Sequence, residues 1–195
     1  MTQAPSLDLF THVRVIVGVV LALGITRILA GLTAFMQHPG HKPLYAAHLV
    51  WVAVVLLSAV HFWWFEFGLI YVHPWTFELF IFVLGYAFLF YLMATLLFPD
   101  GIEEYSGYEE YFISRRAWFY GLVAASVPID LVDTFVKGPS YFRSLGPEYP
   151  VRLAIVFLLS LVGIWTKNRR FHLAFPTIYL LYLMVWIGRL YRVLD

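Results

Sequence analysis

The sequence contains no cysteine, and this absence excludes three kinds of chemistry together. Disulfide bonds, thiolate metal sites and cysteine nucleophiles all require the missing residue. The catalytic motifs H-E-x-x-H and G-x-S-x-G are absent as well. The nearest group of metal-ligating residue types joins His61 and Glu66 with Asp130 and with His73 or His12, but no spacing requires them to meet. Enzymatic activity is therefore the less favoured class of function.

Charged residues are also scarce, at 13% of the 195 residues, and the formal net charge is only +1. No basic stripe is present, so we expect no nucleic-acid partner. Hydrophobic residues make up 62% of the chain, and the mean hydropathy is +0.78. This composition lies well outside that of soluble domains and predicts an integral membrane protein whose main partner is the lipid bilayer.

Six apolar runs each approach the roughly 20 residues that cross a hydrocarbon core about 30 Å thick. The predicted spans are about 12–36, 44–66, 75–98, 116–137, 151–166 and 171–191. Together they use nearly the whole chain, so we predict an all-α fold in which residues 1–195 form one domain, a bundle of six transmembrane helices. The N-terminal MTQAPSLDLF lacks a basic region, which favours an uncleaved first helix.

An even number of spans places both chain ends, the turn at 66–74 and the loop at 137–151 on one side of the membrane, here called side A. The other three loops lie on the opposite side, side B. Lysine and arginine residues near the span ends divide evenly between the sides, so the orientation in the membrane is unresolved. The tight KNRR turn on side B predicts that the last two spans form an antiparallel hairpin.

The first span carries Gly24, Arg27 and Gly31 on one face, because these positions are three and seven residues apart. Small residues on a shared face predict that another helix approaches closely there. The fourth span carries a second unusual face, formed by Ser126, Asp130, Asp133 and Thr134.

The two carboxylates of the fourth span are costly, since a charge at mid-bilayer costs about 2.5–3.5 kcal/mol. Asp133 precedes Lys137 by one helical turn, and this spacing predicts an interfacial i, i+4 ion pair. Asp130 is then the internal carboxylate. We hypothesise that it is ionised and paired with Arg14, at its own depth, or with Arg27 through water.

Counting residues from the span ends places nearly all the internal charge in the side-A leaflet. The predicted buried polar cluster consists of Asp130, Arg14, Arg27, His61, Glu66, Glu78 and Asp133.

His48 and His61 are thirteen residues apart, which separates their rings by about 140° around an ideal helix. They should point to different neighbours, so two singly hydrogen-bonded histidines are expected. We predict no cofactor, although haem or a metal stays an open alternative. The aromatic and imidazole side chains selected as candidate ligand-binding residues are His48, Trp51, Trp63 and Trp64.

The segments VIVGVVLALGITRILAGL, HLVW from His48, HFWW from His61 and RRAWFY from Arg115 resemble the motifs of a family of small bacterial multi-pass membrane proteins without an assigned function. The resemblance implies a bacterial cytoplasmic (inner) membrane location. It assigns no catalytic or binding residue.

Two classes of function follow. The first is a small transporter or channel for protons, cations or a small solute, which uses the polar cluster in one leaflet. The alternative is a non-catalytic accessory or assembly subunit of a larger membrane complex that binds a pigment, quinone or lipid. The 19% aromatic content fits the second class equally well. A homo-oligomer or a larger complex is the expected assembly.

Overall fold

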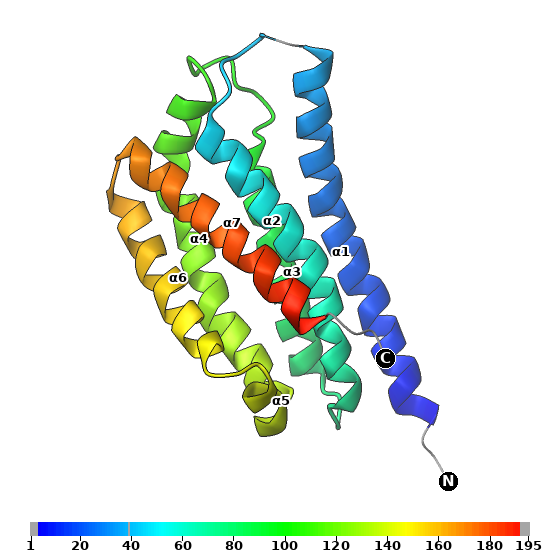
Figure 1. The fold of residues 1–195 in the computed structure, drawn as a ribbon. Coiled ribbons are helices and arrows are strands. Elements are labelled where there is room, and N and C mark those ends of the chain that lie inside the picture. The colour runs from blue at the N-terminus through cyan, green and yellow to red at the C-terminus, as the bar shows by residue number, and fades with distance from the viewer. Residues whose placement is uncertain (1–3, 39, 192–195) are drawn as a thin grey trace.

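The computed structural model describes residues 4–38 and 40–191 of the chain, and within these ranges every regular element is a helix. Figure 1 shows their arrangement as a bundle. The elements are α1 (Ala4–Gln37), α2 (Ala46–Phe65), the 3-10 segment η1 (Glu66–Tyr71), α3 (Phe77–Leu97), α4 (Tyr108–Val136), α5 (Pro139–Ser144), α6 (Glu148–Trp165) and α7 (Arg169–Leu190).

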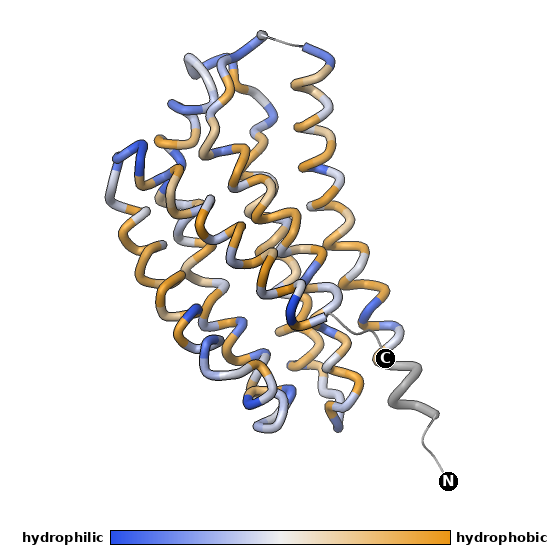
Figure 2. The backbone as a smooth tube through the Cα atoms, in the orientation of Figure 1, coloured by the Kyte–Doolittle hydropathy of each residue, from blue (hydrophilic) through white to orange (hydrophobic). Residues whose placement is uncertain are grey.

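Six of these segments are long and apolar enough to cross a membrane, which confirms the predicted all-α six-helix bundle and its integral membrane character. The spanning segments are Phe10–Gln37, Ala46–Tyr71, Phe77–Leu97, Tyr108–Val136, Glu148–Trp165 and Arg169–Leu190. Figure 2 shows apolar residues along the middle of the helices and hydrophilic residues at both ends of the bundle. The start of α1, η1, α5 and the end of α7 lie toward one end, as expected for side A (Figure 1).

Helix α4 begins at Tyr108, well before the predicted start at 116. The acidic segment ahead of it, interpreted from the sequence as a loop, contains a start signal for the helix. The Glu110 carboxylate accepts hydrogen bonds from the backbone N–H and the hydroxyl of Ser106, at 2.8 and 2.7 Å. A glutamate in the first turn that reaches back in this way satisfies donors that the helix itself leaves free. The first turns of α4 therefore belong to the helix.

The helices pack in pairs that do not follow chain order. Helix α1 packs mainly against α3, α4 against α6, and α2 against α7, while α3 also contacts α4. Helices α6 and α7 are consecutive and antiparallel, yet they have little mutual contact. In Figure 1 they diverge from the turn that joins them, because α6 follows α4 while α7 crosses toward α2. The expected hairpin is therefore open rather than packed.

Glycine residues of α1 set its close approach to α3. A Cβ atom at Gly24 would lie 3.3 Å from the backbone Cα of Tyr91, and one at Gly31 would overlap the ring of Phe98. Between them, Arg27 donates to the carbonyl oxygen of Phe98 from Nε at 3.0 Å. The predicted close packing along this face is confirmed, and its partner is α3.

Replacing Gly24 by leucine should force α1 away from the backbone of α3. We expect Gly24→Leu to destabilise the protein by about 1–3 kcal/mol, the usual range for overpacking. Thermal unfolding of the detergent-purified protein measures this. Gly85→Leu on α3 is the matched control, because a Cβ there meets no atom within 4 Å. Equal melting temperatures for the two variants would contradict the interpretation.

Candidate functional site

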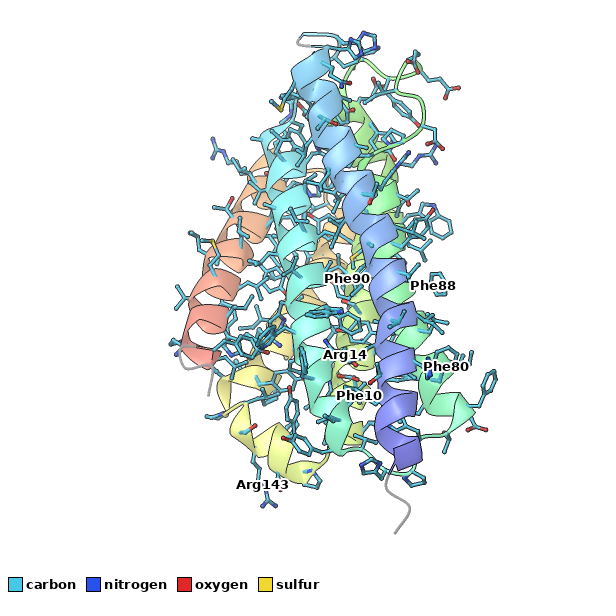
Figure 3. The ribbon with its side chains drawn as sticks, turned by 90° about the vertical axis from the view of Figure 1, so that its right-hand side faces the viewer. Phe10, Arg14, Phe80, Phe88, Phe90 and Arg143 are labelled. Carbon is cyan, nitrogen blue, oxygen red and sulfur yellow. The ribbon has the colours of Figure 1, made fainter. Side chains whose placement is uncertain are left out.

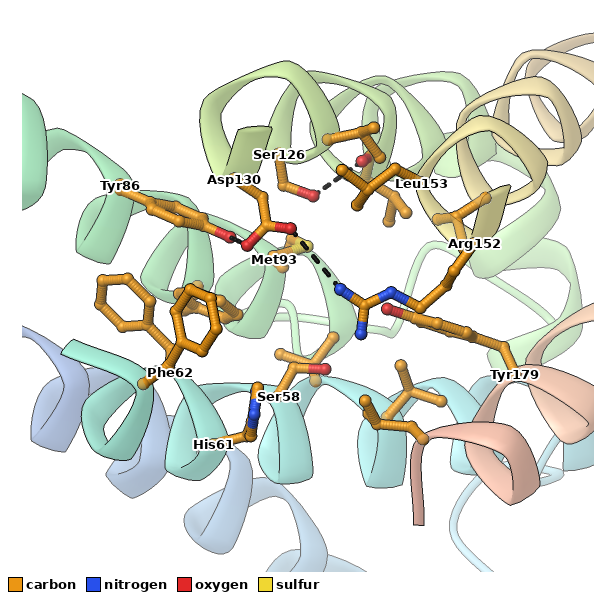
Figure 4. A pocket seen from close by; sticks show the side chains of 18 of the residues that line it. Ser58, His61, Phe62, Tyr86, Met93, Ser126, Asp130, Arg152, Leu153 and Tyr179 are labelled. Carbon is orange, nitrogen blue, oxygen red and sulfur yellow. Dashed lines mark hydrogen bonds and ion pairs between the residues drawn. The ribbon is translucent and has the colours of Figure 1, made fainter. Parts of the chain in front are cut away.

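A cavity of about 90 Å³ lies among α2, α3, α4, α6 and α7. By the usual water-sized measure it has room for roughly half a dozen waters. Its wall is mixed: aromatic and aliphatic side chains alternate with the polar residues Ser58, His61, Tyr86, Ser126, Asp130, Arg152 and Tyr179. Figure 4 shows that these polar side chains point toward a shared space from different helices. An interior polar cavity in a membrane protein is the default candidate for a binding site.

The carboxylate of Asp130 is held by three side chains. Tyr86 on α3 donates to Oδ1 at 3.1 Å, and Tyr149 on α6 donates to Oδ2 at 2.9 Å. Nη2 of Arg152, also on α6, lies 3.7 Å from Oδ2. The hypothesised pairing of Asp130 with Arg14 or Arg27 is therefore wrong. Counting residues gives the depth of a side chain but not its neighbours, and α6 rather than α1 packs against α4.

Arg152 presents a partly buried guanidinium to the cavity. Its side chain is 11% exposed, and its Cζ atom lies 4.3 Å from the ring centre of Trp186. Within the described part of the chain it makes no hydrogen bond, since its distance to Asp130 exceeds hydrogen-bond range. The hydroxyls of Ser58 and Tyr179, which line the same cavity, have no hydrogen-bond partner among the described residues either. Three helices thus direct available donors into one space (Figure 4).

The two candidate histidines of α2 point to different neighbours, as their spacing predicts. His61 lines the cavity, and its Nε2 lies 3.3 Å from the hydroxyl of Tyr191. Burial raises the pKa of Tyr191 to about 12, so this hydroxyl keeps its proton at neutral pH. His48 is fully buried and donates from Nε2 to the carbonyl oxygen of Leu97 at 2.7 Å. Among the residues that the structure describes, each of these two histidines therefore makes one hydrogen bond, which confirms the expectation.

A chain of hydrogen bonds runs from the cavity toward side B. The indole N–H of Trp51, a candidate ligand-binding residue that lines the cavity, donates to the Tyr120 hydroxyl at 3.2 Å. That hydroxyl lies 2.9 Å from Nδ1 of His172, and Nε2 of His172 lies 3.1 Å from the carbonyl oxygen of Thr166. All donors point in one direction when Nε2 carries the proton. Neither Tyr120 nor His172 was predicted from the sequence, because no spacing connects residues on separate helices.

Lys137 forms a second polar centre, apart from the cavity. Its ammonium donates to Oε1 of Glu66 at 2.8 Å and to Oδ2 of Asp133. It also lies 3.9 Å from the ring centre of Phe65. The predicted i, i+4 pair is confirmed, and its interfacial depth stays a prediction. The side chain of Asp133 is 1% exposed, whereas that of Asp130 is 16% exposed. Asp133 is thus the more deeply buried carboxylate.

The remaining members of the predicted cluster lie elsewhere. Arg14 stacks 3.7 Å from the ring centre of Phe67 and 4.6 Å from that of Trp63, near the side-A end of α1 (Figure 3). Arg27 reaches toward side B and pairs with Asp100 at 2.5 Å.

The other predicted residues lie at the surface, among them the candidate ligand-binding residue Trp63, which is 39% exposed. Glu78 is exposed in the first turn of α3, and Trp64, 39% exposed, lies against Phe67 and Tyr191. Of the seven clustered residues, the structure therefore brings only Asp130 and His61 to the cavity. Nowhere in residues 4–38 and 40–191 do three or more histidine, aspartate or glutamate side chains gather in a way that could hold a metal ion.

Removing the ammonium of Lys137 should leave two buried carboxylates without a counter-ion. We expect Lys137→Met to destabilise the protein by about 3–5 kcal/mol, as is usual when one member of a buried pair is lost. The triple variant Lys137→Met, Glu66→Gln, Asp133→Asn should recover most of that loss, since it removes the charges together. Melting temperatures in detergent measure both, with Lys167→Met, at an exposed position, as the control. A triple variant as unstable as the single one would contradict the ion-pair interpretation.

Comparison with protein-family models, with curated proteins and with solved structures finds no match for this chain. The resemblance to small bacterial inner-membrane proteins therefore stays a prediction, as do the location that it implies and the expected assembly. The chain is an integral membrane protein with six candidate spanning helices.

Proposed function

We propose that this protein binds a small molecule bearing hydrogen-bond acceptors in the cavity among α2, α3, α4, α6 and α7. The observation that carries the proposal is the guanidinium of Arg152, which lies inside the bundle and directs its donors into the cavity. Donors that line an interior cavity and have no acceptor in the protein need one from a molecule in the cavity, so an interior arginine of this kind marks a place for an acceptor. Ser58 and Tyr179 add hydroxyl donors on the same wall.

The charges of the cavity favour an uncharged ligand. Its wall contains one carboxylate, Asp130, and one guanidinium, Arg152, which are formally neutral together. A cation would meet the guanidinium, and an anion would meet the carboxylate 3.7 Å from it. Asp130 already accepts hydrogen bonds from Tyr86 and Tyr149. Its role is to position Arg152, and the N–H groups of Arg152 donate hydrogen bonds to the ligand. This supports the accessory, ligand-binding class of function.

The proposal predicts that gently purified protein carries a small molecule and that Arg152 retains it. Native mass spectrometry of the full chain, extracted in mild detergent, should show a bound species whose occupancy falls about tenfold or more in Arg152→Gln. Arg143→Gln is the matched control, because Arg143 is exposed on α5, away from the cavity (Figure 3). Equal occupancy in both variants, each with a wild-type melting temperature, would contradict binding by Arg152.

A transporter is the second candidate, and one observation favours it. Asp130, Tyr86, Tyr149 and His61 bring exchangeable protons together at the side-A half of the bundle. The chain from Trp51 to Thr166 lies between this region and side B, so a proton would need this chain to rearrange.

Proteoliposomes that enclose a pH-sensitive dye would measure proton movement directly. If the protein conducts protons through Asp130, Asp130→Asn should lower the rate by about tenfold or more, because an amide cannot exchange a carboxyl proton. Arg143→Gln should conduct at the wild-type rate. Proton movement that is equal with and without protein, or equal in Asp130→Asn and the wild type, would reject transport by this route and leave the binding proposal intact.

A further inference from the structure

A groove of about 270 Å³ lies on the outer surface between α6 and α7. It exists because these two helices pack against different partners and diverge below their connecting turn. Its sides are apolar, with Ile155 on α6 and Ile178 on α7 exposed by 52% and 67%. Both helices are spanning segments, so the groove faces the hydrocarbon of the bilayer.

The groove and the cavity share a wall. Arg152, Val156 and Tyr179 line both spaces. A molecule in the groove therefore lies directly beside the guanidinium and the phenol that supply donors to the cavity. Toward side A the groove is bridged by an ion pair between Arg189 of α7 and Glu148 of α6, at 2.6 Å.

We infer that the ligand is a neutral amphiphile with a carbonyl-bearing ring and a long apolar chain, the class of membrane-borne isoprenoid quinones. This inference rests on the proposed binding in the cavity and adds the ligand class and the lateral route. The ring lies in the cavity and the chain lies in the groove between α6 and α7.

Two features of the cavity select this class over an anionic lipid. The first is charge: Asp130 and Arg152 compensate each other, and a phosphate near Arg152 would be repelled by the carboxylate 3.7 Å away. The second is shape: the apolar part of the wall contains several flat aromatic side chains, on which a ring can stack. They are Trp51, Phe62, Phe65, Tyr86, Phe90 and Tyr179. A ring carbonyl accepts hydrogen bonds from the guanidinium without bringing charge.

The test compares two probes, the dimethoxy-methyl benzoquinone without a side chain and the same ring carrying a decyl chain. Each is titrated into the full chain in phosphatidylcholine nanodiscs, and quenching of tryptophan fluorescence reports binding, because Trp51 lines the cavity and Trp186 packs on Arg152. We expect saturable binding of both probes. Arg152→Gln should raise both dissociation constants by about tenfold or more, while Arg143→Gln leaves them unchanged.

Blocking the groove separates the route from the cavity. The double variant Ile155→Phe, Ile178→Phe places two rings in the path of the chain, and it should raise the dissociation constant of the decyl probe by about fivefold without affecting the probe that has no chain. The control Leu158→Phe, Leu181→Phe adds the same rings on the same helices at positions that are 61% and 59% exposed and outside the groove. It should bind both probes like the wild type.

Each outcome decides one part of the inference. If the groove variant binds the decyl probe normally, the lateral route is wrong while cavity binding stands. If neither probe binds saturably, or if the species that mass spectrometry finds on the purified protein is a phospholipid retained by Arg152, the quinone class is wrong while the proposed function stands. If Arg152→Gln changes neither the probes nor the co-purified species, both the inference and the proposed function are rejected. Melting temperatures confirm that every variant is folded.

Discussion

The buried ammonium of Lys137 fixes the side-A end of the bundle. It links the end of α4 to the junction of α2 and η1 through Asp133 and Glu66, and all three side chains are almost fully buried. In hydrocarbon such groups are tolerated only when they meet one another, so the pairing fixes how far α4 can slide or turn against α2. Asp130 lies one turn earlier on α4. Its direction toward α3 and α6, and so the polar wall of the cavity, follows from that anchor.

Much of the fold could be predicted from the sequence because hydropathy controls it. The six spans, the side shared by their ends, and the glycine face of α1 all follow from composition and helical period. The start of α4 was harder, since a short contact between Ser106 and Glu110 decides it within a segment that reads as polar and irregular. The polar composition of this segment favours a loop, whereas the contact between Glu110 and Ser106 favours a helix start. The helix start is what the structure contains.

The candidate site was only partly predictable, for a different reason. The depth of a residue depends on its own helix alone, and counting residues placed Asp130 and His61 at a similar level. Both line the cavity. Proximity depends on which helices are neighbours, and the chain does not pack in sequence order. Arg14 therefore stacks on aromatic rings of the α2–η1 region, while the cation near Asp130 is Arg152. The spacing of residues in the sequence also did not indicate the buried hydrogen bonds of Tyr120 and His172, which join α2, α4 and α7.

The divergence of α6 and α7 has a consequence for how a ligand would be chosen. A bilayer leaves no empty space, so lipid tails fill the groove whenever no other chain lies in it. Exchanging one hydrocarbon chain for another changes the buried apolar area very little, and the hydrophobic effect then contributes almost nothing to affinity. Discrimination between a ligand and the surrounding lipid must arise at the shared wall of Arg152 and Tyr179, where the groove meets the polar cavity. In the proposed arrangement the groove limits which molecules can enter, and the cavity determines which of them stay.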